Sequence, residues 1–153
     1  KKALELFGEL QQRGLDPDVI TYSATIAACD KGRQWEKALQ LFSELQQCGL
    51  EPTVITYSAT ISACEKGGQW EKAFELFDDL QQRGLEPDLI TYGAMISACE
   101  KGFQWEKASR LFDELQQRGL EPDIITYTAM ISACEKGGQC DKAFELFDDM
   151  RRR

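Results

Sequence analysis

The sequence predicts an all-α fold: a right-handed α-solenoid of stacked antiparallel helical hairpins in 35-residue repeats, with about nine helices. The first observation is the segment VITYSATISACEKG at residues 54–67, which recurs in related form at residues 19–32, 89–102 and 124–137. The second is the constant spacing of equivalent residues, such as Tyr22, Tyr57, Tyr92 and Tyr127. A fixed period of this length is typical of arrays in which each unit packs only on its neighbours.

This period divides the chain into units of one solenoid domain. Residues 1–18 form a partial repeat, with a second helix and a connector. Three full repeats occupy residues 19–53, 54–88 and 89–123, and a truncated fourth repeat occupies residues 124–153. Because the chain starts at Lys1 and ends inside a repeat, we expect it to be a fragment of a longer array.

Each full unit is expected to form a pair of antiparallel helices. In the first unit, apolar residues three or four positions apart from Val19 to Cys29 form one face of the first helix. Asp18 precedes this helix and is expected to cap it through its carboxylate. The second helix begins near Trp35, which we place in the apolar core. In the last unit Cys140 replaces the tryptophan, and this change predicts a looser final hairpin.

The net charge of −8 argues against a general nucleic-acid or membrane-surface binder. No apolar run approaches the roughly 20 residues of a membrane span, so no membrane insertion is expected. Much of the acidity falls on the second helices. A row of first-helix lysines can therefore act locally, because the Debye length is only about 8 Å at physiological salt.

Neither a metal site, a cofactor nor a catalytic centre is expected. The six cysteines are predicted to be free, because neighbouring units lie roughly 8–10 Å apart, whereas bridged Cα atoms lie within about 7 Å. The chain has no histidine and no CxxC pair. Adjacent carboxylates such as Asp78 and Asp79 point about 100° apart on a helix and cannot face one substrate together. The protein is therefore predicted not to be an enzyme.

The unit resembles the pentatricopeptide repeat over essentially the whole chain. VITYSATIS opens the first helix, A-x-x-L-F lies in the second, and G-L-x-P-D closes the unit. The tetratricopeptide repeat is the nearest competitor, but its period is 34 residues. The resemblance implies a single-stranded RNA-binding module that reads one nucleotide per repeat along the first helices. It also implies a role in organellar RNA processing, stability or translation, in a mitochondrion or chloroplast.

The same resemblance assigns site residues in three sets. The residues that select RNA bases would be Ser23, Thr53, Ser58, Asp88, Gly93, Asp123 and Thr128. The residues that sandwich successive bases would be Ile20, Ile55, Ile90 and Ile125, and those close to phosphates would be Lys31, Lys66, Lys101 and Lys136. The pair of Ser58 with Asp88 suggests guanine. Asp88 and Asp123 are also expected to act as helix caps.

Two alternatives stay open at this point. The small residues on the exposed face of the first helices could equally serve tight packing between neighbouring first helices. The second alternative concerns function: an acidic helical-repeat scaffold for protein–protein interaction within an organellar assembly. The net charge of −8 and the irregular base-selecting residues favour this scaffold.

Overall fold

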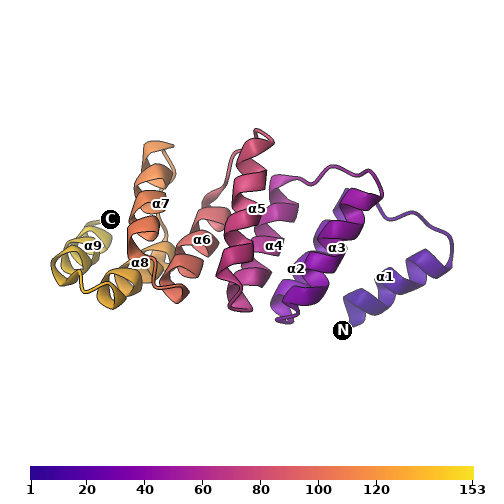
Figure 1. Cartoon of the computed structure of the whole chain (residues 1–153), viewed down its shortest axis with the longest axis horizontal. Coiled ribbons are helices and arrows are strands. Elements are labelled where there is room, and N and C mark those ends of the chain that lie inside the picture. Colours follow the sequence, from indigo (N-terminus) through magenta and orange to yellow (C-terminus); the bar gives the residue numbers. More distant parts are fainter.

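The computed structural model describes residues 1–153 and contains nine α-helices and no strands. The helices are α1 (Lys2–Gln12), α2 (Val19–Lys31), α3 (Trp35–Gln47), α4 (Val54–Lys66), α5 (Trp70–Gln82), α6 (Leu89–Lys101), α7 (Trp105–Gln117), α8 (Ile124–Lys136) and α9 (Cys140–Arg152). They follow one another along an elongated stack with the chain ends at opposite ends (Figure 1). The predicted all-α solenoid is confirmed. None of the helices combines the length and apolarity needed to cross a bilayer.

The helices lie in two layers, one of first helices (α2, α4, α6 and α8) and one of second helices (α1, α3, α5, α7 and α9). The backbones of successive first helices pack directly on each other, whereas those of successive second helices are too far apart for contact. Successive first helices therefore lie closer together than successive second helices, and we call the exposed side of the first-helix layer the inner face of the stack. Fully buried short side chains, such as those of Thr60, Ala63 and Ala98, permit this close approach. Tight packing is thus one role of the small residues.

Pairs of aromatic side chains make the hydrophobic core continuous across each boundary between units. Phe42 of α3 packs edge-on against Tyr57 of the next unit, with ring centroids 5.0 Å apart. The same contact recurs as Phe7–Tyr22, Phe77–Tyr92 and Phe112–Tyr127. Each tyrosine hydroxyl is hydrogen-bonded to a carboxylate on the second helix of its own unit, as in Tyr92 to Glu114 Oε1 at 2.8 Å. One residue type therefore joins the two helices of a unit and also joins neighbouring units.

The connectors fix where each first helix begins. The carboxylates of Asp18, Asp88 and Asp123 each accept a hydrogen bond of 2.8 Å from the backbone N–H three residues later. The predicted cap at Asp18 is confirmed, and the hydrogen bonds from Thr21 hold the pKa of Asp18 below its usual value. Thr53 performs the same task in its unit through a capping box with Thr56.

The tryptophans lie at the boundaries between units. Trp35, the first residue of α3, packs on Gly67 at the end of α4, and a Cβ on Gly67 would come within 2.3 Å of its ring. Gly67 has an ordinary φ of −82°, so it is required here for close approach rather than for backbone conformation. The three tryptophans are only partly buried. Each tryptophan contacts the glycine that ends the first helix of the following unit. The backbones of α8 and α9 lie as close together as those of the other pairs. However, α9 buries only Leu146, and the looser hairpin stays a prediction.

Candidate nucleic-acid interface

A row of isoleucines runs along the inner face of the stack. Ile20, Ile55, Ile90 and Ile125 are the second residues of α2, α4, α6 and α8, and each side chain is 67 to 73% exposed. The same residue type is thus presented to solvent once per unit. Single exposed apolar side chains are common on proteins, but a regular row of them indicates a binding surface.

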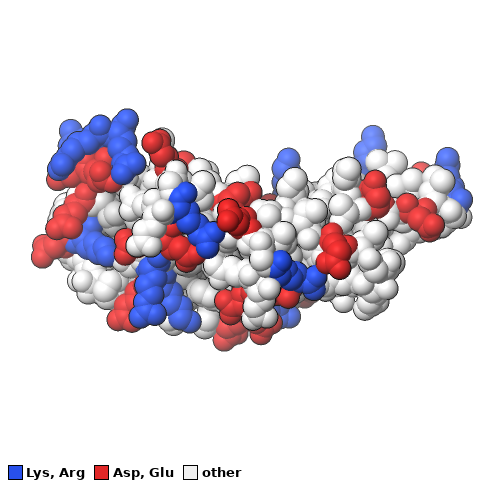
Figure 2. Space-filling view, turned by 90° about the horizontal axis from the view of Figure 1, so that it is seen from above, with Lys and Arg blue, Asp and Glu red and all other residues white.

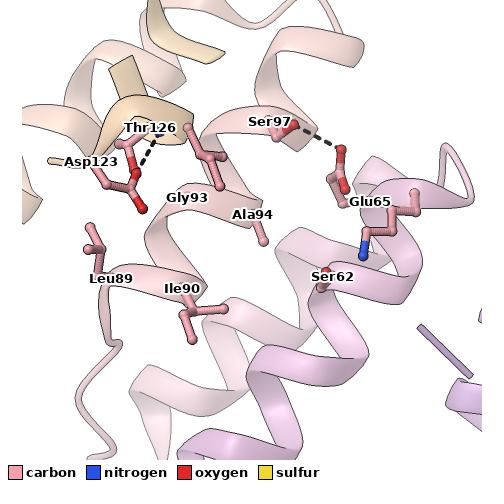
Figure 3. Close-up of a pocket in the computed structure, with 11 residues that line it drawn as sticks. Ser62, Glu65, Leu89, Ile90, Gly93, Ala94, Ser97, Asp123 and Thr126 are labelled. Carbon is pink, nitrogen blue, oxygen red and sulfur yellow. Dashed lines mark hydrogen bonds between the residues drawn. The ribbon is translucent and has the colours of Figure 1, made fainter. Parts of the chain in front are cut away.

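A cleft of about 260 Å³ lies between two members of this row, Ile90 and Ile125. Asp123 and Thr126 lie at one end of it, Glu65 and Ser97 lie at the other, and Gly93 lies between them (Figure 3). The cleft is open above Gly93 because this residue has no side chain. A second hollow of about 350 Å³ lies one step further along the stack, between α6 and α8. Clefts bordered by apolar side chains with polar groups at their ends suit flat, polar-edged ligands.

The structure brings Ser58 and Asp88 together at a unit boundary. The Ser58 hydroxyl donates to Asp88 Oδ1 at 3.2 Å and lies 2.5 Å from Thr91 Oγ1. Thr91 in turn donates to Asp88 Oδ1 from its backbone N–H and its hydroxyl, at 2.8 and 2.7 Å. Ser58 is only 5% exposed, so the part of this pair most open to a ligand is the second carboxylate oxygen of Asp88.

The pair in the first full unit is linked less directly. The Ser23 hydroxyl lies 2.8 Å from Thr56 Oγ1 and donates to the carbonyl of Val19 at 2.7 Å. Thr53 lies 3.2 Å from the same Thr56 hydroxyl. Ser23 and Thr53 therefore meet only through Thr56, and no carboxylate takes part.

The last two base-selecting positions also differ from each other. Gly93 and Asp123 line one cleft, and Asp123 accepts hydrogen bonds from the backbone and the hydroxyl of Thr126. Thr128 is exposed, and its hydroxyl donates to the carbonyl of Ile124 at 2.7 Å. Only Ser58 and Asp88 therefore bring a base-selecting hydroxyl and a base-selecting carboxylate into contact.

Gly93 offers a direct test of the packing around this cleft. A Cβ at this position would meet only Thr126 Oγ1, at the ordinary contact distance of 3.5 Å. We therefore expect Gly93→Ala to raise the free energy of unfolding by about 0.5–1 kcal/mol, because glycine inside a helix is unfavourable relative to alanine. Denaturant titration followed by circular dichroism measures this change. A loss of stability would show that the inner face cannot accommodate even a methyl group.

The lysine row is paired with carboxylates, which the sequence analysis did not anticipate. Lys66 lies 2.9 Å from Asp30, Lys101 lies 2.7 Å from Glu65, and Lys136 is paired with Glu100. In each case the acid belongs to the preceding unit. Lys31 is exposed and forms no such pair. The sequence does carry the signal, because an acidic residue directly precedes the lysine in all four units.

Basic and acidic groups are mixed elsewhere on the surface as well. On the face in Figure 2 they alternate along the stack, and the largest basic group lies at the C-terminal end, at the left. The four cysteines of the repeated segment are free and buried, so they form no reactive or metal-binding cluster on the surface. Burial raises the pKa of the Cys64 and Cys99 thiols. Nowhere do three or more Cys, Asp or Glu residues converge as metal ligands.

Comparison with known proteins returns one family. A model described as the PPR repeat family matches residues 59–101 and 90–136, which together make up half of the chain. A model of the pentatricopeptide repeat domain matches residues 5–67, and a third, of the PPR repeat, matches residues 125–153. No curated protein matches the chain.

Solved structures with the same fold include the pentatricopeptide repeat protein PPR10 in complex with an 18-nt psaJ RNA element. That protein is 30% identical over 99% of this chain and 26% of its own, with a TM-score of 0.72. PPR10 from maize gives 28% identity over 99% of this chain and 27% of its own, with a TM-score of 0.59. This chain thus spans about a quarter of the length of those proteins.

The fold is also shared with the PPR domain of Arabidopsis thaliana protein-only RNase P 1, solved in complex with tRNA. The TM-score is 0.81 and the identity 16%, over 99% of this chain and 80% of that domain. At this identity the likeness concerns the fold alone.

Proposed function

Because the chain belongs to the pentatricopeptide repeat family, we propose that it binds single-stranded RNA along its first helices, one nucleotide per unit. The observation that carries this proposal is the row of exposed isoleucines that borders clefts with polar ends. The RNA complex of PPR10, 30% identical to this chain, supports it. The family further favours organellar RNA processing, stability or translation as the process served.

Each base would insert between two successive isoleucines, with its edge toward the residues at the unit boundary. The best-defined position is the cleft between Ile90 and Ile125. Stacking on aromatic platforms contributes about 1–3 kcal/mol per base, and the contribution of isoleucine is smaller because it has no π-system. With four isoleucines, we expect the chain to bind weakly.

The unit of Ser58 and Asp88 is the one that we propose to select guanine. Every hydrogen bond to Asp88 goes to Oδ1, so Oδ2 is available as an acceptor. The Watson–Crick edge of guanine offers two adjacent N–H donors, and Oδ2, with two lone pairs, can accept from them. Uracil and cytosine cannot present the same pair of donors.

Substitution of the isoleucines tests the proposal. We expect Ile90→Ala combined with Ile125→Ala to weaken binding of a guanine-containing single-stranded RNA about tenfold, because both walls of one cleft are lost. Both side chains are exposed, so the free energy of unfolding should stay within about 0.5 kcal/mol of the original. Fluorescence anisotropy at low salt measures the affinity, and thermal melting measures the stability.

Phe144→Ala is the matched control, because Phe144 is an apolar residue of similar exposure, 70%, on α9 in the other layer. It should leave RNA affinity unchanged. If the unmodified protein failed to bind single-stranded RNA at low salt, the proposal would fail. Equal affinities for the double variant and the original would place any binding elsewhere on the molecule.

A scaffold for a protein partner is the second candidate function. The pairing of three of the four lysines and the net charge of −8 favour it, because both reduce attraction for phosphates. A stoichiometric protein partner that stays bound after nuclease treatment would support the scaffold. Loss of the partner on nuclease treatment would indicate an RNA bridge instead.

A further inference from the structure

Three repeated contacts on the inner face combine an acid from one unit with a serine and a lysine from the next. Asp30 accepts from Ser62 at 3.1 Å and pairs with Lys66. The other two contacts are Glu65 with Ser97 and Lys101, and Glu100 with Ser132 and Lys136. We call these contacts the acid ladder. Their repetition at every boundary between first helices indicates a built arrangement rather than a chance surface pair.

The three acids of the ladder, together with Glu135, balance the charge of the lysine row. Each of the four lysines has a carboxylate directly before it, at Asp30, Glu65, Glu100 and Glu135, so the row as a whole carries no net charge. The acids of the ladder are largely buried, with side chains 10 to 16% exposed, whereas their lysines are 33 to 40% exposed. A phosphate could therefore reach the lysines, but it would have to share each one with a fixed carboxylate.

We propose that Asp30, Glu65 and Glu100 are internal competitors of RNA phosphates, and that they weaken the sequence-independent part of RNA binding. This inference rests on the proposed function. A carboxylate paired with a lysine occupies the place that a phosphate oxygen would take, and its negative charge also repels an approaching phosphate. Glu65 shows both features, because it pairs with Lys101 and lines the cleft beside Ile90 (Figure 3).

The effect expected from each carboxylate follows from Coulomb's law. A unit charge within about 6 Å of a phosphate in water changes affinity about threefold. A freed lysine also adds to the salt dependence of binding, by about 0.7 in the slope of log affinity against log salt for a single strand. Removal of two acids should therefore tighten binding about tenfold at low salt and steepen the slope by about 1.4.

The variant Asp30→Asn with Glu100→Gln tests this proposal, because each amide can still accept the hydrogen bond from its serine. Affinities for a uridine oligomer and for a guanine-containing oligomer are measured from low to physiological salt. The control, Asp78→Asn with Asp113→Asn, makes the same change in charge at exposed residues of the second-helix layer. It should leave the slope unchanged. Glu65→Gln is tested separately, so that the proposal can still be judged if the double variant does not fold.

The outcomes separate this inference from the function on which it rests. Tighter binding of both oligomers with a steeper slope, seen only in the ladder variants, is the expected result. If the original protein binds RNA and the ladder variants bind equally or more weakly, the carboxylates are not competitors, while the proposed function stands. If neither the original nor the ladder variants bind at low salt, both proposals fail.

Discussion

Raising the pH from about 8 to about 11 is expected to unfold the protein. Each full or truncated repeat buries one tyrosine and one cysteine. Burial raises the pKa of Cys64 to about 11 and those of Cys99 and Tyr127 to about 12. The pKa values of Tyr57 and Tyr92 are raised further, first by burial and then by hydrogen bonds to carboxylates.

The sign of the effect follows from proton binding. In the unfolded chain, thiols ionise near pH 8.5 and tyrosines near pH 10, at roughly the values of model peptides. Above these values the unfolded chain releases protons that the folded chain keeps, so stability falls as the pH rises. The stability that these groups contribute is complete below about pH 8. It then falls by about 1.4 kcal/mol per pH unit for each group, from about pH 8.5 for a cysteine and about pH 10 for a tyrosine, until the folded pKa of that group is reached. Because both residue types recur in each repeat, these losses add together, against the roughly 5–15 kcal/mol that stabilises a typical domain.

Helix content by circular dichroism and ionisation by tyrosinate absorbance should therefore change together in one alkaline transition. Cys99→Ala removes one titrating group, so stability should fall less steeply between about pH 9 and about pH 11, by about 1.4 kcal/mol per pH unit. Tyrosinate absorbance that appeared near pH 10 while the helices stayed intact would contradict the prediction. It would mean that the hydroxyls ionise in the folded state.

The regular parts of this fold are predictable because they depend on spacing within one unit. A cap such as Asp18 acts on an N–H only three residues away, and Gly49 ends α3 at a φ of 76°. The core face of each first helix follows from residues three or four positions apart, as with Tyr22 and Ile26, both fully buried. Four nearly identical copies make each of these local signals more certain.

Contacts between units are harder to predict, because they depend on how far one helix slides against the next. The spacing of residues within one unit does not show which acid Lys66 meets, and the structure pairs it with Asp30, 36 residues away. The sequence also placed Trp35 in the core of its own unit, whereas its ring covers Gly67 of the next unit. For the same reason, the resemblance picked out Ser58 and Asp88 but did not show that Ser58 would be almost fully buried.

Gly67→Ala is expected to lower the free energy of unfolding by about 1–3 kcal/mol, because the new methyl group overlaps the Trp35 ring. In a chain of this size, each kcal/mol lowers the melting temperature by about 2–4 °C. Gly32→Ala is the matched control. Gly32 has the same place at the end of α2 and a φ of −83°, but no tryptophan packs on it. The difference between the two variants isolates the contact with Trp35.

A double-mutant cycle completes this test. In a Trp35→Ala background, Gly67→Ala should cost much less than it does with the tryptophan present, because the ring is gone and only the Cβ of residue 35, at 3.0 Å, is left to meet the new methyl group. The stability of a stacked array depends on the contacts between neighbouring units, so loosening this boundary should also raise amide hydrogen exchange, mainly in α2 and α3. Equal costs for Gly67→Ala and Gly32→Ala would show that the tryptophan moves aside. The distance between Ile20 and Ile55 would then be set by the packing of the first helices alone.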